Sequence, residues 1–266
     1  MAAPSPPSRV LLVGALGRMG ACVRAALADE PTLELAAALE APGHSGIGEM
    51  LEPGIRVEDD AKSALARCDV AIDFSVPAAA LAHLRAAADA GVAFVTGTTG
   101  FGAAEREEIE TLARRIPVLH APNFSVAVNV LAWLTREAAS KLGPGYDAEI
   151  LELHHAAKRD APSGTALHLA EAVAEARGTA LADQLVLERA GETGARPAGA
   201  IGVQALRGGD CTGEHTVLFV GRGERLELTH RAATRDHFAR GAVRAAAWLL
   251  GRAPGLYRME AVLGLG

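Results

Sequence analysis

Two adjacent histidines and a lysine lie close together in the segment Glu152–Thr165, which reads Glu-Leu-His-His-Ala-Ala-Lys-Arg-Asp-Ala-Pro-Ser-Gly-Thr. Histidine titrates near neutral pH and suits general acid–base chemistry. Lysine supplies a compact cation that can stabilise a developing negative charge or deliver a proton. The segment therefore predicts that His154 and Lys158 handle protons.

The local pattern also predicts how these side chains are presented. Alternation along Glu149–His155 indicates a strand with Ile150, Glu152 and His154 on one face, and with Leu151, Leu153 and His155 on the other. The chain then leaves the strand over Ala156–Pro162, and Ser163 is a suitable N-cap for a helix that follows. The amides of Gly164 and Thr165 would favour an anion such as a carboxylate. Together with Lys158 and Arg159, they indicate a small acidic substrate.

Two alternatives for this segment stay open from its residues alone. Structural histidines with satisfied hydrogen bonds, beside solvated basic residues, would account for the pattern equally well. Zinc binding is the second alternative, but adjacent strand residues point to opposite faces and no cysteine is nearby. We therefore expect no metal site.

A glycine-rich turn near the N-terminus predicts a dinucleotide site. Gly14-Ala15-Leu16-Gly17-Arg18-Met19-Gly20 lies between a predicted strand, Val10–Val13, and a helical pattern. Glycines there allow a tight turn and a close approach of helix amides to a pyrophosphate. The spacing is Gly-x-x-Gly-x-x-Gly, so the motif alone could be an ordinary turn. Glu40 strengthens the interpretation, because it ends the second predicted strand about 20 residues further on, where a carboxylate can bind a ribose.

Cofactor choice can be argued from the residue after Glu40. Ala41 offers no cation to a 2′-phosphate placed beside the Glu40 carboxylate. This favours NADH over NADPH, although Arg18 could partly compensate. Gly97-Thr98-Thr99 also follows a predicted strand, where ligands of open α/β sheets bind.

The elements that must position these residues alternate between strand and helix in the first half of the chain. Predicted strands cover Val10–Val13, Leu33–Glu40, Val70–Phe74, Val92–Thr96 and Pro117–His120, with a helix at Ala103–Arg115 and another starting near Pro77. This order indicates βαβ units and a parallel sheet. After Asn123 the rhythm changes. There we expect helices at Val126–Leu142, Thr165–Ala176 and Phe238–Leu250, strands at Ala148–His154, Thr216–Val220 and Arg225–Thr229, and a loop at Gly191–Gly199.

Composition is that of an ordinary globular enzyme, with 50% hydrophobic and 22% charged residues among 266. A net charge of -6 gives no general attraction to nucleic acid or anionic lipid. The three cysteines are far apart and suit a reducing compartment. The start is polar and proline-rich, and the apolar run Val10–Val13 is too short for a signal sequence or a membrane span. We expect a cytoplasmic protein.

Taken together, these motifs resemble the dihydrodipicolinate reductase family, now usually called 4-hydroxy-tetrahydrodipicolinate reductase, of the diaminopimelate and lysine pathway. The resemblance covers nearly the whole chain. It rests on the following strings: Gly14–Gly20, Glu40, Asp73-Phe-Ser75, Gly97-Thr-Thr-Gly100, Asn123-Phe-Ser-Val126, Glu152–Thr165, Gly213-Glu-His-Thr216 and Thr229-His230 with Phe238-Ala-x-Gly241-Ala242.

The resemblance implies an α/β fold: a Rossmann-type doubly wound parallel sheet with a second, α+β mixed-sheet domain. It implies a dinucleotide-binding domain over residues 1–125, completed by 235–266, and a substrate-binding and tetramerisation domain over 126–234 of a homotetramer. The implied contacts to NADH or NADPH are Gly14, Ala15, Leu16, Gly17, Arg18, Met19, Glu40, Gly97, Thr98, Thr99, Ala121, Pro122, Asn123 and Phe124. His154 is implied as proton donor or acceptor and Lys158 as the second proton-handling group, with His155, Gly164 and Thr165 as substrate contacts.

The expected reaction is hydride transfer from nicotinamide to a cyclic dicarboxylate, giving tetrahydrodipicolinate. The chain departs from the family pattern at Ala41, where better-known members have arginine, and this puts an NADPH preference in doubt. Ala156 and Ala157 also replace bulkier residues. The alternatives are a related two-domain reductase of another small acid, such as an aspartate or semialdehyde derivative, and a dinucleotide-binding regulator without activity.

Overall fold

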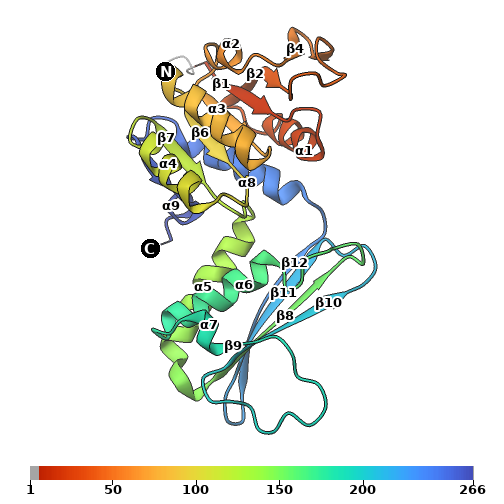
Figure 1. Ribbon diagram of the computed structural model, residues 1–266, viewed down its shortest axis with the longest axis vertical. Coiled ribbons are helices and arrows are strands. Elements are labelled where there is room, and N and C mark those ends of the chain that lie inside the picture. The colour runs from red at the N-terminus through yellow and green to blue at the C-terminus, as the bar shows by residue number, and fades with distance from the viewer. Residues whose placement is uncertain (1–5, 266) are drawn as a thin grey trace. The chain divides into compact units, whose positions relative to one another are not determined.

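A computed structural model describes residues 6–265, so most of the proline-rich start lies outside the described residues. The chain divides into two compact units (Figure 1). The first comprises Met1–Val126 together with Asp236–Gly266, and the second comprises Ala127–Arg235. Among the described residues, no helix is both long and apolar enough to cross a membrane.

The first unit is built on an eight-stranded sheet in the order β13-β7-β6-β5-β1-β2-β4-β3. Its strands are β1 Ser8–Val13, β2 Leu33–Leu39, β3 Met50–Glu52, β4 Ile55–Glu58, β5 Val70–Asp73, β6 Ala93–Thr96, β7 Pro117–His120 and β13 Gly255–Tyr257. Neighbouring strands are parallel, apart from β3, which is antiparallel to β4. Strand β1 lies between β2 and β5, so the strand order reverses beside β1. This is the Rossmann-type doubly wound arrangement.

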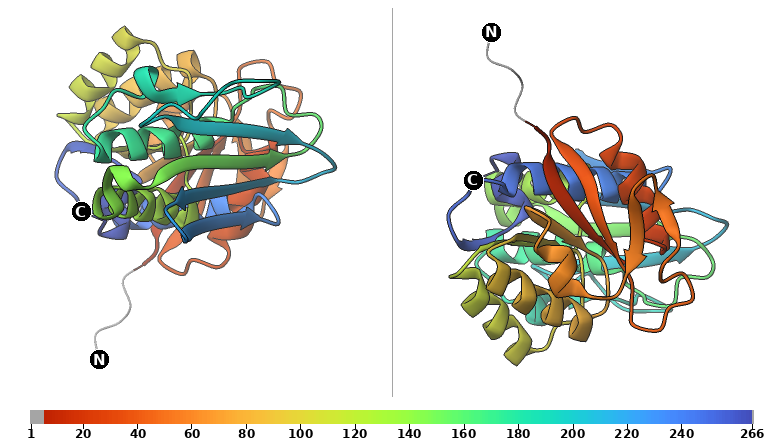
Figure 2. Two further views of the ribbon diagram at one scale, coloured as in Figure 1. Left: turned by 90° about the horizontal axis from the view of Figure 1, so that it is seen from below. Right: turned by 90° about the horizontal axis from the view of Figure 1, so that it is seen from above.

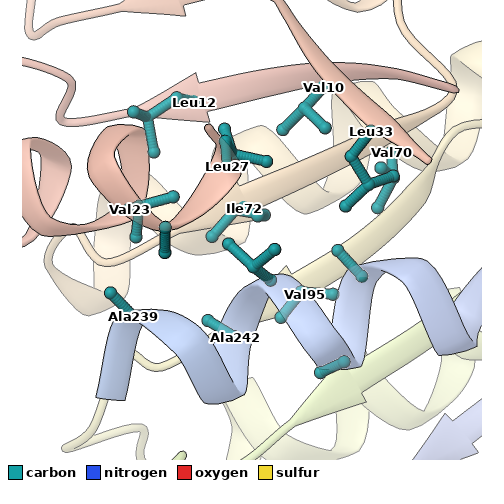
Figure 3. Close-up of a cluster of buried hydrophobic side chains, with 14 of the residues drawn as sticks. Val10, Leu12, Val23, Leu27, Leu33, Val70, Ile72, Val95, Ala239 and Ala242 are labelled. Atoms are coloured by element: carbon teal, nitrogen blue, oxygen red, sulfur yellow. The ribbon is translucent and has the colours of Figure 1, made fainter. Parts of the chain in front are cut away.

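Helices cover both faces of this sheet, because each central strand is apolar on both sides. They are α1 Arg18–Leu27, α2 Ala61–Leu65, α3 Pro77–Ala90, α4 Ala103–Ala113, α8 Asp236–Leu249 and α9 Met259–Leu263. Along β1, Val10 and Leu12 belong to the core beneath α1 and α8, whereas Leu11 and Val13 belong to the core beneath α2, α3 and α4. Figure 3 shows Ala239 and Ala242 of α8 turned toward Val10, Leu12 and their neighbours.

Helix α8 completes the first unit although it comes from the C-terminal part of the chain. Gly241 explains how closely it can approach, since a Cβ there would overlap the carbonyl oxygen of Phe124. A larger residue at this position would push α8 away from the core to which its buried alanines Ala239 and Ala242 belong.

The second unit is a five-stranded sheet in the order β12-β11-β8-β10-β9 (Figures 1 and 2). Its strands are β8 Asp147–His154, β9 Leu185–Val186, β10 Ile201–Arg207, β11 Gly213–Val220 and β12 Arg225–Ala232. Strand β10 is parallel to β8 and β9, and β11 is antiparallel to β8 and β12, so the sheet is mixed. Helices α5 Val126–Leu142 and α6 Gly164–Ala176 pack on one face, and α7 Leu181–Gln184 is short.

The predicted strands and helices all occur, with ends displaced by a few residues at most. The elements β3, β4, α2, α7, β9, β10, β13 and α9 were not predicted from the sequence. Of these, β10 matters most because it carries Arg207. The segment Gly191–Gly199 lies in a stretch without helix or strand, as expected.

Candidate active site

The turn after β1 is tight, and glycine is required at Gly14 by its backbone angle and at Gly20 by close packing. Gly14 has a φ of +70°, and its amide donates to the carbonyl oxygen of Leu39 at 2.8 Å. Gly17 is the N-cap of α1, and its amide donates to the Gly14 carbonyl at 3.0 Å. A Cβ on Gly20 would overlap the carbonyl oxygens of Gly14 and Ala15. The first turn of α1 therefore lies directly against the strand end, as a pyrophosphate-binding turn requires.

Glu40 is attached to the same turn. It immediately follows β2, and its Oε1 accepts a hydrogen bond of 2.7 Å from the amide of Leu16. The carboxylate is half-buried, so its second oxygen is the one that can meet a ribose hydroxyl. Arg18 and Ala41, the two residues considered for the 2′-phosphate, are both exposed.

The loops after β5 and β6 pack against each other at the carboxyl edge of the sheet. Gly97 lies against the Phe74 ring, which a Cβ would overlap, and the Thr98 hydroxyl donates to the carbonyl of Ser75 at 3.2 Å. Phe74 also meets Phe124 edge-on at 5.6 Å. Thr99 and Pro122 are exposed at this edge, whereas Ala121 and Phe124 are buried and Met19 and Asn123 half-buried.

Two residues that sequence reasoning did not assign hold these loops. Asp73 is fully buried, accepts from the amide of Ser75 at 2.7 Å and from its hydroxyl at 2.6 Å, and pairs with His83 of α3 at 2.7 Å. His120 Nε2 lies 3.0 Å from the carbonyl oxygen of Thr98, and burial lowers the pKa of His120. The string around Asp73 belongs to the family resemblance, but nothing in the local pattern indicates His83 or His120.

His154, the residue predicted to handle protons, lies at the end of β8 in the second unit. His154 and Glu152 are both buried on the covered face of the sheet, and Nδ1 of His154 is hydrogen-bonded to Oε2 of Glu152. The alternation predicted for Ile150, Glu152 and His154 is therefore confirmed. Nε2 of His154 faces Gly213 of β11, where a Cβ would come within 2.9 Å of it. A glycine at this point leaves space beside Nε2.

Arg207 and Ser163 hold Glu152 in turn. The guanidinium contacts both carboxylate oxygens, at 2.9 Å to Oε2 and 3.0 Å to Oε1. The amide of Ser163 donates to Oε1 at 3.0 Å. Burial alone would raise the pKa of Glu152, but the hydrogen bonds from Arg207, His154 and Ser163 lower it overall. Glu152 is therefore an anion.

The pKa of His154 is lowered from its ordinary value. Burial is the main cause, and the positive charges of Lys158 and Arg207 add to it, while Glu152 opposes them. The His215 ring lies 5.1 Å from that of His154 and edge-on to it. Burial lowers the pKa of His215 to about 4, and its Nε2 is 3.1 Å from the hydroxyl of Ser163. His215 is thus a neutral neighbour of His154 near pH 7.

The loop after β8 carries the remaining predicted residues. Lys158 is paired with Asp160, its Nζ lying 2.9 Å from both carboxylate oxygens. The amide of His155 donates to the carbonyl of Cys211 at 2.8 Å. Ser163 is the N-cap of α6 as predicted, and its hydroxyl accepts from the Ala166 amide at 3.2 Å. Gly164 and Thr165 form the first turn of α6, which is the end of a helix that attracts anions.

His154 and Lys158 were predicted from the sequence, whereas no role was predicted for Glu152, Arg207 or His215. A signal existed for Glu152, which shares a strand face with His154, and for His215, which occurs in the Gly213–Thr216 string. Within residues 6–265, no three His, Cys, Asp or Glu side chains are grouped so as to hold a metal ion.

A doubly wound unit with a glycine turn and an acidic residue after β2, together with a mixed-sheet unit carrying a histidine–carboxylate pair, defines a two-domain nicotinamide-dependent oxidoreductase. Comparisons with known proteins specify the class further. Family models described as "Dihydrodipicolinate reductase, N-terminus" and "Dihydrodipicolinate reductase, C-terminus" match residues 8–124 and 127–263.

Relatives agree over nearly the whole chain. The 4-hydroxy-tetrahydrodipicolinate reductase of Anaeromyxobacter dehalogenans strain 2CP-1 is 51% identical over 265 residues, covering 97% of this chain and 98% of the relative. That of Ralstonia pickettii strain 12J is 48% identical, covering 97% and 100%. The chain belongs to the dihydrodipicolinate reductase family.

Solved structures show the same relationship. Dipicolinate-bound dihydrodipicolinate reductase from Paenisporosarcina sp. TG-14 superposes with a TM-score of 0.80 at 26% identity, covering 95% of this chain and 97% of that one. Aspartate semialdehyde dehydrogenase II from Vibrio cholerae, with a TM-score of 0.59 and 13% identity, covers 91% of this chain and 98% of that one. The second similarity shows a shared fold alone.

Proposed function

We propose that this protein reduces 4-hydroxy-tetrahydrodipicolinate to tetrahydrodipicolinate with NADH or NADPH, in the diaminopimelate route of lysine biosynthesis. The observation that carries the proposal is the buried His154–Glu152 pair, which lies within the part of the chain matched by the family's C-terminal model. Proton handling beside an anion-binding helix end is the chemistry that this reduction needs.

The residues of the first unit fit a dinucleotide. The turn from Gly14 to Met19 is tight enough for a pyrophosphate to approach the amides of α1, and Glu40 would accept from a ribose hydroxyl. Gly97–Thr99 and Ala121–Phe124 follow β6 and β7 at the same edge of the sheet and would hold the nicotinamide end. The bound cofactor supplies the hydride. Because Ala41 provides no cation beside Glu40, we expect NADH to be used at least as well as NADPH.

In the second unit, His154 would donate a proton through Nε2 as negative charge builds on the substrate ring. Lys158 would stabilise that charge or deliver a second proton, which requires its exchange away from Asp160. The first-turn amides of α6 at Gly164 and Thr165, with His155 beside them, would bind a carboxylate.

The free face of the second sheet supports a homotetramer. Leu151, Leu206 and Val220 point away from the helices and are 38%, 54% and 41% exposed. Large apolar side chains exposed on an open sheet face favour an interaction surface. Sedimentation of the intact protein should give four chains, and Leu206→Glu should give smaller species. The free thiols of Cys68 and Cys211 support a cytoplasmic location.

The decisive assay follows NADH and NADPH oxidation separately, with the condensation product of pyruvate and aspartate semialdehyde formed in the cuvette. Turnover with either cofactor supports the proposal, and the ratio of the two kcat/KM values tests the role of Glu40. NADH binding without turnover would leave a dinucleotide-binding regulator, whereas turnover of aspartate semialdehyde alone would indicate another small-acid reductase.

A single substitution tests the chemistry. His154→Gln should lower kcat by about 100-fold or more with little change in KM, because general acid catalysis contributes roughly that much. An unchanged kcat with a raised KM would contradict the assigned role of His154.

A further inference from the structure

Glu152 and Arg207 form an ion pair behind His154, and the proposed reaction assigns no role to either residue. Glu152 is 1% exposed, yet it carries a negative charge in the centre of the sheet. A buried charge is costly unless it is paired and hydrogen-bonded. A hydrophobic residue would fill the same position on the covered face of β8, as Ile150 does two residues earlier. The charge therefore calls for a reason beyond packing.

The hydrogen bonds of Glu152 fix its orientation completely. Oε1 accepts from the Ser163 amide and from Arg207, and Oε2 accepts from Arg207 and meets Nδ1 of His154. The parallel register pairs Arg207 of β10 with His154 of β8, so the guanidinium reaches the carboxylate from the neighbouring strand. Arg207 is itself anchored, since it donates to the carbonyl of Asp160 at 2.6 Å.

This arrangement decides which nitrogen of His154 carries the proton in the neutral ring. An ionised carboxylate can only accept hydrogen bonds, so Nδ1 must be the donor. Nε2 then holds the lone pair and faces the space beside Gly213. A free imidazole has no such restriction, so the tautomer is a property that the pair imposes.

We propose that Glu152 and Arg207 are positioning residues for His154: Glu152 holds the imidazole by Nδ1 so that Nε2 exchanges the proton, and Arg207 holds Glu152. The catalytic part of this inference rests on the proposed function, whereas the tautomer itself does not. Arg207 also offsets the charge of Glu152, so that His154 is not permanently protonated.

The charged neighbours of His154 act on its protonation in opposite directions, and Asp160 pairs with one of them, Lys158. Glu152 on β8 favours the charged imidazole, and Arg207 on β10 and Lys158 on the following loop disfavour it. His215 on β11 is neutral near pH 7, and His230 of β12 lies beyond it, 6.4 Å from His215. Removing Glu152 and removing Arg207 should therefore change the protonation of His154 in opposite directions.

The tautomer can be measured in the unmodified protein. With ¹⁵N-labelled histidine, long-range ¹H–¹⁵N spectra above pH 7 distinguish Nδ1–H from Nε2–H rings, and the spectrum of His154→Gln assigns the missing signals. We expect the His154 ring to be the Nδ1–H form. A dominant Nε2–H form would overturn the proposal, whether or not the protein turns over the expected substrate.

Variants then test the catalytic consequence. Glu152→Gln should lower kcat about 100-fold, leave KM nearly unchanged, and move the limb of the kcat/KM profile governed by His154 to lower pH. Arg207→Met should move the same limb to higher pH. Glu149→Gln is the matched control. Glu149 lies on the same strand as Glu152 but on the opposite face, and it also pairs with two arginines, Arg189 and Arg196. This variant should move the limb in neither direction.

Folding is separated from positioning by the double variant Glu152→Gln/Arg207→Met, which leaves no unpaired charge in the sheet. It should fold, bind NADH like the unmodified protein and retain the low kcat. Limbs that shift in the same direction in both single variants, or a double variant with normal kcat, would contradict the proposal. If the unmodified protein shows no turnover, the proposed function fails, and the NMR experiment still decides the tautomer.

Discussion

Gly213→Ala offers a test of the histidine site that adds only one methyl group. The new Cβ would lie 2.9 Å from Nε2 of His154, and 3.3 Å from Cδ2. Ordinary contact begins near 3.4 Å, so the ring would have to move by about 0.5 Å. It cannot move freely, because Glu152 holds Nδ1 and the His215 ring lies 5.1 Å away on another side.

The size of the effect follows from this displacement. A misplacement of about 1 Å in a catalytic group can cost roughly 100-fold in rate. We therefore expect kcat to fall about 10-fold to 100-fold, which corresponds to about 1.4 to 2.7 kcal/mol of transition-state stabilisation. The methyl group also occupies the space beside Nε2, so KM for the substrate should rise. The dissociation constant for NADH, measured by fluorescence, should not change.

A matched control removes the contribution of backbone strain. Gly209 lies in the loop that leads into β11 and also has a positive φ, but a Cβ there would meet nothing within 4 Å. Gly209→Ala should therefore lose stability as Gly213→Ala does, and urea unfolding measures this loss. Its kcat should stay within about twofold of that of the unmodified protein, because surface changes of this kind seldom affect a site. If Gly213→Ala kept full kcat, or Gly209→Ala lost as much, the placement of Nε2 beside Gly213 would be refuted.

Two further predictions concern stability and cofactor choice. The pKa of His215 falls from 6.5 to about 4 on folding, so the unfolded chain binds its proton first and stability is lost as pH falls from about 6.5 towards 4. Over this range the free energy of unfolding falls by about 3 kcal/mol through His215. Urea unfolding at pH 7 and pH 4.5 should therefore show a smaller pH dependence in His215→Gln than in the unmodified protein. Glu40→Gln can still accept the Leu16 amide but loses its charge. The ratio of kcat/KM for NADPH to that for NADH should therefore rise about 10-fold, and an unchanged ratio would exclude Glu40 as a ribose ligand.

The cofactor turn shows how far a short motif can be interpreted without a structure. The strand, the turn and the helix start follow from local apolar patterns and glycines, and all three were predictable. The reason for the unusual spacing of the glycines could not be predicted, because it depends on the folded turn, in which Gly20 lies beneath the carbonyls of Gly14 and Ala15. The hydrogen bond from Leu16 to Glu40 joins residues on separate strand ends, and it depends on the register of β1 with β2.

The chemical site divides in the same way. Period-2 alternation places Glu152 and His154 on one strand face, and the Pro-Ser-Gly-Thr string indicates the start of α6. Arg207 could not be found because the sequence pattern did not reveal β10. Its pairing with β8 is parallel and spans a long connection, so no local pattern specifies which residue lies opposite His154. Non-local register decides which cation holds the carboxylate.

Charge balance around His154 would explain how an imidazole with a lowered pKa serves as the acid of the proposed reaction. In the described structure, Arg207 offsets Glu152 and Asp160 offsets Lys158, so the site presents no excess charge to the ring, and burial dominates. A substrate with two carboxylates brings negative charge beside the ring without bringing a cation. Nearby negative charge favours the imidazolium, so substrate binding would itself supply the protonated form of His154. Burial is the main reason why the resting histidine is neutral, and Arg207 adds to it by opposing Glu152, so that protonation would depend on the substrate.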